Sequence, residues 1–179
     1  MTQYFHEEEY TSAKEQRKKT LIIFYVILSI YLLASIAFVI YYTTLPYKSP
    51  IINDIKTIHH VITAVMSIFS MLYLGIAFKR VNRFYRMMFN LKTGLKETTI
   101  ATFLRYDETP QEKDGVDCKA LIFSEWNKYK KDYYERKVLV LEEKEYPEFT
   151  ENQTIKFVTQ GNLLISYEII EDNDKEDNQ

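Results

Sequence analysis

The chain has 179 residues, a formal net charge of −2 and a single cysteine, Cys118. One thiol excludes an intramolecular disulfide, and a charge that is not basic makes nucleic acid an unlikely partner. The length leaves room for one small domain beside any membrane segments. Frequent Ile, Lys, Asn and Tyr residues suggest a bacterial source with an AT-rich genome.

The chain begins with a polar segment, residues 1–19, which we expect to lie in the cytoplasm. Residues 20–44 follow as a first predicted transmembrane helix, because no charged residue occurs between Leu21 and Tyr47. A bilayer core of about 30 Å needs about 20 apolar helical residues. The run is also longer than the apolar core of a signal peptide, so we expect it to be retained.

A second predicted transmembrane helix occupies residues 57–93, after a short extracytoplasmic loop at 45–56. It is uncharged from Thr57 to Phe78 and then continues as a basic amphipathic extension on the cytoplasmic side. Since neither span carries an acidic or basic residue, we do not expect a carrier. Small residues predict where the helices pack against each other or a neighbour: Ser35, Ser67, Ser70 and Gly75.

The distribution of Lys and Arg predicts the orientation. Four lie before the first span, two between the spans and six after the second span, which predicts a multi-pass protein of the cell membrane with both termini cytoplasmic. Arg80, Arg83 and Arg86 predict a basic surface that attracts anionic membrane lipid. The simpler interpretation is that they are only the usual basic flank of a span.

Residues 97–170 predict a cytoplasmic domain of five short strands. Alternating apolar residues mark strands within 98–108, 116–126 and 133–143, and two more within 155–170 meet at the turn Gln160-Gly161-Asn162. We interpret Asp107–Asp117 as a turn-rich loop. Two helices followed by a small five-stranded antiparallel β-barrel, SH3-like or OB-like, are the predicted fold. The acidic tail, residues 171–179, is predicted to be disordered.

One cluster of aromatic and basic residues is the best candidate for a binding surface. Aromatic and basic side chains can stack nucleic-acid bases, and they are also enriched in protein hot spots. We favour a protein partner, although half of the rings could instead close the barrel core. The predicted partner-binding residues are Trp126, Tyr129, Tyr133, Tyr134 and Arg136.

No catalytic, metal or cofactor site is predicted. Adjacent His59 and His60 point about 100° apart on a helix and cannot chelate one ion alone. Residues 97–170 contain no histidine, so neither a Cys–His pair nor a Ser-His-Asp triad can form there. We expect Cys118 to act as a small buried apolar residue. The chain is therefore not expected to be an enzyme.

The predicted function is that of a membrane-anchored scaffold or accessory subunit whose cytoplasmic barrel binds a partner protein. The alternative is a homo-oligomeric pore or membrane effector gated by a cytosolic ligand on the barrel. Such a pore would need a polar lining, and the spans offer only hydroxyl groups for it: Ser29, Ser35, Thr63, Ser67 and Ser70.

Overall fold

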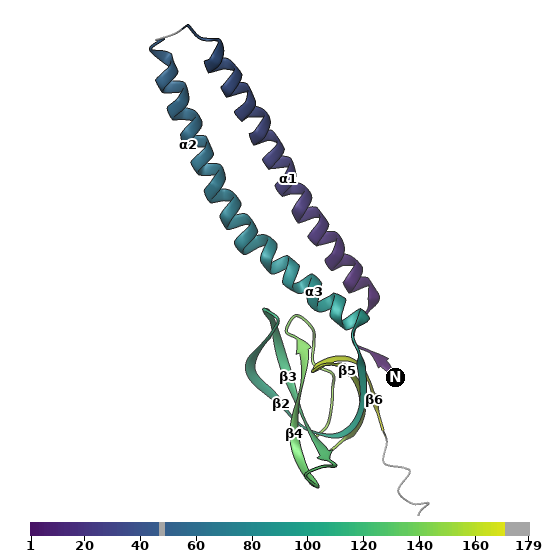
Figure 1. The fold of residues 1–179 in the computed structure, drawn as a ribbon. Coiled ribbons are helices and arrows are strands. Elements are labelled where there is room, and N and C mark those ends of the chain that lie inside the picture. Colours follow the sequence, from purple (N-terminus) through teal and green to yellow (C-terminus); the bar gives the residue numbers. More distant parts are fainter. Residues whose placement is uncertain (47–48, 171–179) are drawn as a thin grey trace, which may run out of the picture. The chain divides into compact units, whose positions relative to one another are not determined.

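The computed structural model describes residues 1–46 and 49–170, which fall into two compact units (Figure 1). Residues 14–82 form one unit, called here the helical hairpin. Residues 1–13 join residues 83–170 in the other, called here the barrel domain. The predicted tail at 171–179, with Tyr47 and Lys48 of the predicted outer loop, lies outside the described residues.

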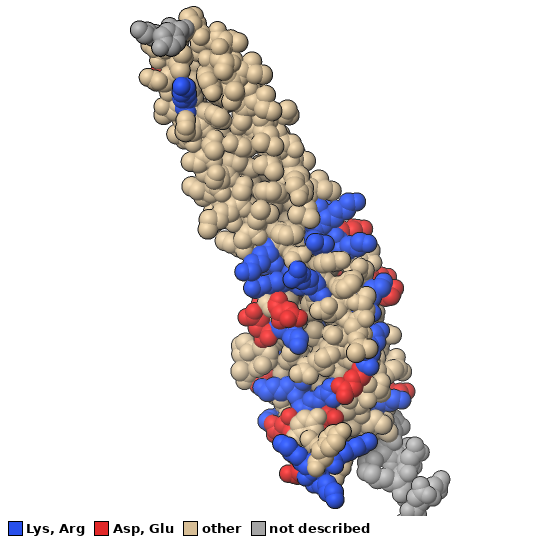
Figure 2. All heavy atoms as spheres, viewed as in Figure 1, with Lys and Arg blue, Asp and Glu red and all other residues tan. Residues whose placement is uncertain are grey.

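Two long helices make up most of the first unit. Helix α1 spans Glu7–Thr44, and α2 spans Ile51–Leu72 before running through a π-helical turn, η1 at Tyr73–Phe78, into α3 at Lys79–Thr93. Both continuous helices are long and apolar enough to cross a membrane. Figure 2 shows the upper part of the hairpin almost free of charged side chains.

Polar and aromatic contacts join α1 to α2 and η1 within the helical hairpin. The Tyr31 hydroxyl donates to Thr63 Oγ1 at 3.0 Å. The Tyr73 hydroxyl donates to the carbonyl of Thr20 at 3.0 Å, and its ring stacks on Phe24 at 5.7 Å between centroids. Because these hydroxyl groups bond inside the hairpin, they do not need water or another chain to satisfy them.

The barrel closes from five strands: β2 at Lys96–Lys113, β3 at Val116–Asn127, β4 at Asp132–Leu141, β5 at Thr154–Gln160 and β6 at Leu163–Ile169. Around the barrel they follow the order β2-β3-β4-β6-β5, and β5 pairs with β2. A fourth strand that returns to lie beside the first is the Greek-key arrangement.

The predicted all-antiparallel pairing is wrong, because the barrel is mixed. Since β5 runs antiparallel to β2, β6 must run in the same direction as β4 when it closes the barrel. The two strands therefore meet as a parallel pair, at Leu139 and Leu163. The parallel pair forms because β5 adds to the edge of β2 rather than to the edge of β4. No local sequence pattern indicates which of these two edges β5 joins.

The predicted loop at 107–117 is also mostly strand. Strands β2 and β3 turn only at Asp114 and Gly115, where both residues have positive φ. Strand β2 continues through Pro110 because its register with β3 shifts between Asp107 and Gln111. Such an irregularity accommodates a proline, which has no main-chain N–H to pair.

The N-terminus contributes a sixth strand that the sequence did not predict. Strand β1, Thr2–Gln3, pairs antiparallel with β6, and the main-chain N–H of Phe5 donates to the carbonyl of Ile165 at 2.9 Å. The Lys144 ammonium donates to the carbonyl of Tyr4 and to Glu9 Oε1. Residues 1–13 are thus built into the barrel domain.

Two apolar cores hold the barrel domain together. The barrel interior is filled mainly by aromatic and branched side chains, including Phe103, Phe123, Phe157, Val138 and Ile155. A second core covers the outer face of β3, β4 and β6. There α3 contributes Met87, Met88 and Leu91, the N-terminal segment contributes Phe5 and Ala13, and the barrel contributes Cys118, Ala120, Leu139, Leu163 and Ile165.

Candidate partner-binding arm

The tip of the β3–β4 hairpin projects from the barrel as a two-stranded arm (Figure 1). The register of β2 with β3 reaches Ser124 and no further, and β4 meets β6 only at Leu139. Beyond those points β3 and β4 pair only with each other. Residues 125–135 are called the arm here. A two-stranded ribbon on its own is marginally stable, so contacts at its base matter.

The turn of the arm is organised by Asn127. Its side-chain Oδ1 accepts the main-chain N–H groups of Tyr129 and Lys130 at 2.9 and 3.1 Å. Its carbonyl accepts the N–H of Lys131, which adopts a φ of 50°. Asn is suited to this role because its short amide can bond to the main chain just after it. The turn is therefore held in one conformation.

Four aromatic side chains of the arm are exposed. Trp126 and Tyr133 lie directly opposite each other on β3 and β4, with ring centroids 5.0 Å apart in an edge-to-face arrangement. Trp126 is 48% exposed, Tyr133 is 66% exposed and Tyr129 is 99% exposed. Tyr134, also exposed, has its pKa raised by burial of its hydroxyl and by a hydrogen bond with Glu125.

Lysines surround these rings. Lys128, Lys130 and Lys131 occupy the turn and are exposed, and none makes an ion pair with any residue that the structure describes. In Figure 2 blue side chains border uncharged surface at the lower end of the barrel domain, where Figure 1 shows the arm. The arm thus combines exposed aromatic surface with positive charge.

Arg136 does not share this exposure, although the sequence places it in the same cluster. Its side chain is only 11% exposed and lies inside the barrel wall. The guanidinium donates to Glu125 Oε2 and Glu97 Oε2, each at 2.9 Å, and to the hydroxyls of Thr99 and Thr159. Arg136 therefore fixes the base of the arm to β2 and β5 rather than offering a free cation.

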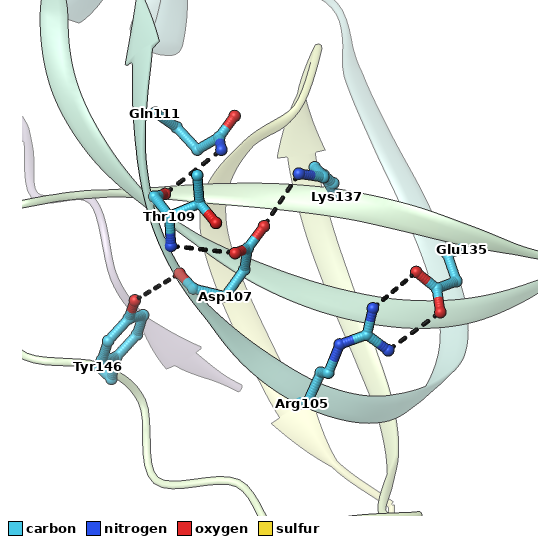
Figure 3. Close-up of polar contacts among 7 residues, drawn as sticks. All are labelled: Arg105, Asp107, Thr109, Gln111, Glu135, Lys137 and Tyr146. Atoms are coloured by element: carbon cyan, nitrogen blue, oxygen red, sulfur yellow. Dashed lines mark hydrogen bonds and ion pairs between the residues drawn. The ribbon is translucent and has the colours of Figure 1, made fainter.

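Two ion pairs on the outer face of the sheet also brace the arm (Figure 3). Both pairs reach across β3 and join β2 to β4. Arg105 forms two hydrogen bonds of 3.0 Å with Glu135, and the Lys137 ammonium donates to Asp107 Oδ2 at 2.9 Å. The hydrogen bonds from Lys137 and from the N–H of Thr109 hold the pKa of Asp107 well below its usual range.

The main-chain oxygen of Asp107 accepts a hydrogen bond from the Tyr146 hydroxyl at 3.3 Å, and Gln111 Nε2 donates to the carbonyl of Thr109 (Figure 3). Every charged group in this cluster is thus engaged by another residue of the fold. These contacts join β2 to β4 and support a structural role for the cluster.

The basic residues expected at a membrane surface are exposed on the last helix. Arg80 lies at the end of the helical hairpin, while Arg83 and Arg86 begin the barrel-domain part of α3. The Arg83 side chain lies against Gly115 in the β2–β3 turn. Met87, Met88 and Leu91 of α3 pack in the outer core of the barrel domain, whereas the three arginines stay exposed.

The four residues expected at helix contacts lie in different surroundings. Ser35 Oγ is 3.3 Å from His59 Nε2 and therefore faces α2. Ser67 and Ser70 donate to carbonyls four residues earlier in their own helix, and Ser67 is exposed. Gly75 lies in η1 with open space where a Cβ would point. Only Ser35 contacts the partner helix directly through its hydroxyl.

No group of three or more His, Cys, Asp and Glu side chains converges on a possible metal position in the described part of the chain. Burial of Cys118 raises the pKa of its thiol, as expected for a cysteine in an apolar core. Searches of protein-family models, curated proteins and solved structures find no match to this chain. The arm's own geometry is therefore the basis for a functional proposal.

Proposed function

We propose that the protein is a two-span membrane anchor whose cytoplasmic barrel domain binds a partner protein through the arm. The observation that carries this proposal is the exposed Trp126–Tyr133 pair on a braced, projecting ribbon. Trp and Tyr dominate the energy of protein interfaces, especially where rigid surroundings hold them in place. Anchoring would raise the effective concentration of the arm at the membrane surface.

The N-terminal strand supports the two-span topology by an argument independent of charge. Because β1 pairs with β6, residues 1–13 and the barrel must lie on the same side of any membrane. The chain between them must then cross an even number of times, and it contains two helices of sufficient length and hydropathy. The Lys and Arg distribution favours the cytoplasm as that side.

The strand order supports the OB-like alternative for the barrel, because OB-folds are five-stranded Greek-key barrels. It does not favour nucleic acid as the ligand. Nucleic-acid binding relies on an extended basic surface, whereas the chain carries a net charge of −2.

The pore alternative finds less support in the helical hairpin. Thr63 accepts the Tyr31 hydroxyl, and Ser35 faces His59. Ser29 and Ser67 donate to carbonyls of their own helices. These internal bonds leave few hydroxyl donors to line an aqueous path.

The test is to purify the tagged full-length chain from its source membrane in mild detergent and weigh the intact complex. We expect a stoichiometric second protein that is lost from the double variant Trp126→Ala, Tyr133→Ala. The variant Ile100→Ala serves as the matched control, because Ile100 is an exposed apolar residue on β2, outside the arm. A closed ring of this chain alone, unaffected by the arm variant, would instead favour the pore.

A further inference from the structure

The arm has a free strand edge as well as exposed side chains. Residues 132–138 of β4 pair on one side with β3, and on the other side β4 pairs within the described chain only at Leu139. The N–H of Leu139 donates toward β6, to the carbonyl of Asn162. Main-chain groups alternate in direction along a strand, so those of Glu135 and Lys137 point toward the same open side.

An open strand edge is a template for another extended chain, and peptide-binding domains use such edges. The barrel domain already binds a short extended segment in this way, since β1 adds to β6. At the tip the N–H of Tyr133 is occupied by Asp132 Oδ1 at 2.8 Å. The available edge therefore lies between Tyr133 and Leu139.

The side chains beside this edge restrict what can bind there. Trp126 and Tyr133 offer an apolar contact at the tip. Lys128, Lys130 and Lys131 supply positive charge without an ion-pair partner among the described residues. Farther along, Glu135 and Lys137 are engaged by Arg105 and Asp107. The unbalanced charge is thus confined to the turn.

From this arrangement we infer that the arm binds an acidic, extended segment of its partner protein as an added strand along β4. This inference rests on the proposed function and specifies the chemistry of the partner. The partner's main chain would bond to Glu135 and Lys137, an apolar side chain would cover Trp126 and Tyr133, and carboxylates would face the turn lysines. A nucleic acid could satisfy the lysines but not the strand edge.

The experiment uses the full-length chain in nanodiscs of zwitterionic lipid, with binding followed by fluorescence anisotropy. The probe is a short labelled peptide in which glutamates alternate with valine and phenylalanine. Three comparison probes are its lysine counterpart, a version N-methylated at alternate residues to block strand pairing, and a single-stranded oligonucleotide of similar length. We expect only the acidic, unmethylated peptide to bind, and its affinity should fall with added salt.

Two variants locate the binding. Trp126→Ala should weaken binding of the acidic peptide about tenfold or more, as expected for an aromatic anchor. Replacing Lys128, Lys130 and Lys131 with Gln should weaken binding and flatten its salt dependence. Replacing Lys96 and Lys156 with Gln should change neither the peptide affinity nor its salt dependence, because these two lysines lie on barrel strands outside the arm. Hydrogen exchange of β3 and β4 checks that each variant keeps the fold.

Failure of the acidic peptide to bind, equal binding of the methylated peptide, or binding of the oligonucleotide in its place would overturn the inference. The proposed function is judged separately, by the Trp126-dependent capture of a native partner. If that capture succeeds while the peptide fails, the arm is a partner site of different chemistry. If the capture fails and a ring forms, both proposals fall.

Discussion

The guanidinium of Arg136 lies 2.9 Å from the carboxylate of Glu125, and both side chains are largely shielded from solvent in the barrel wall. The same guanidinium lies over the ring of Phe157, with 5.8 Å between the central carbon and the ring centroid. A cation that sequence reasoning assigns to the binding surface is therefore used to hold that surface in position.

Replacing Arg136 with Gln should destabilise the barrel domain strongly. The change leaves Glu97 and Glu125 without their cation, and breaking such a shielded pair costs about 3 kcal/mol. By contrast, Arg105→Gln removes an exposed pair that solvent screens, and it should destabilise the domain much less. Denaturant unfolding of both variants checks this ranking, and equal losses would contradict the structural role given to Arg136.

Truncating Phe5 should loosen the barrel from its N-terminal side. Phe5 is 8% exposed within the outer core, and replacing a buried Phe with Ala costs about 3 kcal/mol. Hydrogen exchange should then become faster at Ser166 and Tyr167, the residues that face β1. His6→Ala changes an exposed neighbour and should leave exchange as it was. Unchanged protection of β6 in Phe5→Ala would show that β1 adds nothing to the domain.

The Asp107–Lys137 pair predicts a loss of stability in acid. The pKa of Asp107 is lower in the folded chain than its unfolded value of about 4, so unfolding takes up a proton in acid. Its contribution is present above about pH 4 and is lost as the pH falls below that value. Asp107→Asn should lower the unfolding midpoint at pH 7 and make its decline between pH 5 and pH 3 shallower. Glu108→Gln, at an exposed neighbour, is the control.

Labelling of single cysteines tests the topology. In a Cys118→Ser background, Thr44→Cys places a thiol at the end of α1, and Ser12→Cys places one in the barrel domain. A maleimide that cannot cross membranes should label Thr44→Cys on intact cells and Ser12→Cys only after permeabilisation. The native chain is the blank, because its only cysteine is buried. Labelling of both positions on intact cells would exclude the two-span orientation.

Much of the fold could be predicted from local patterns. The two uncharged runs predicted long apolar helices, and these are present, with the second continuing through Leu91 to Thr93. The change to alternating residues predicted five strands, and the turn at Gln160-Gly161-Asn162 joins β5 to β6 as expected. These elements have periodic signals that extend over many residues, so they can be recognised without knowledge of the fold.

Features that depend on distant pairing could not be predicted in this way. Strand β1 has two residues and therefore no period, and its partner β6 is almost the whole chain away. The outer core also accounts for β3 being apolar on both faces, because one face lines the barrel interior and the other packs against α3 and the N-terminal segment. The aromatic residues near Trp126 were found from composition. Only the strand register shows that these aromatic residues lie on an exposed arm, whereas Arg136 is shielded at the base of that arm.

The pairing of β1 with β6 also sets an order of events during synthesis. The first strand leaves the ribosome before either long helix exists, whereas its partner follows both helices and the other four barrel strands. Pairing between such distant segments cannot begin until both are available. The first strand must therefore stay unpaired while both helices and four barrel strands are made, and the barrel domain can be completed only after β6 has been translated.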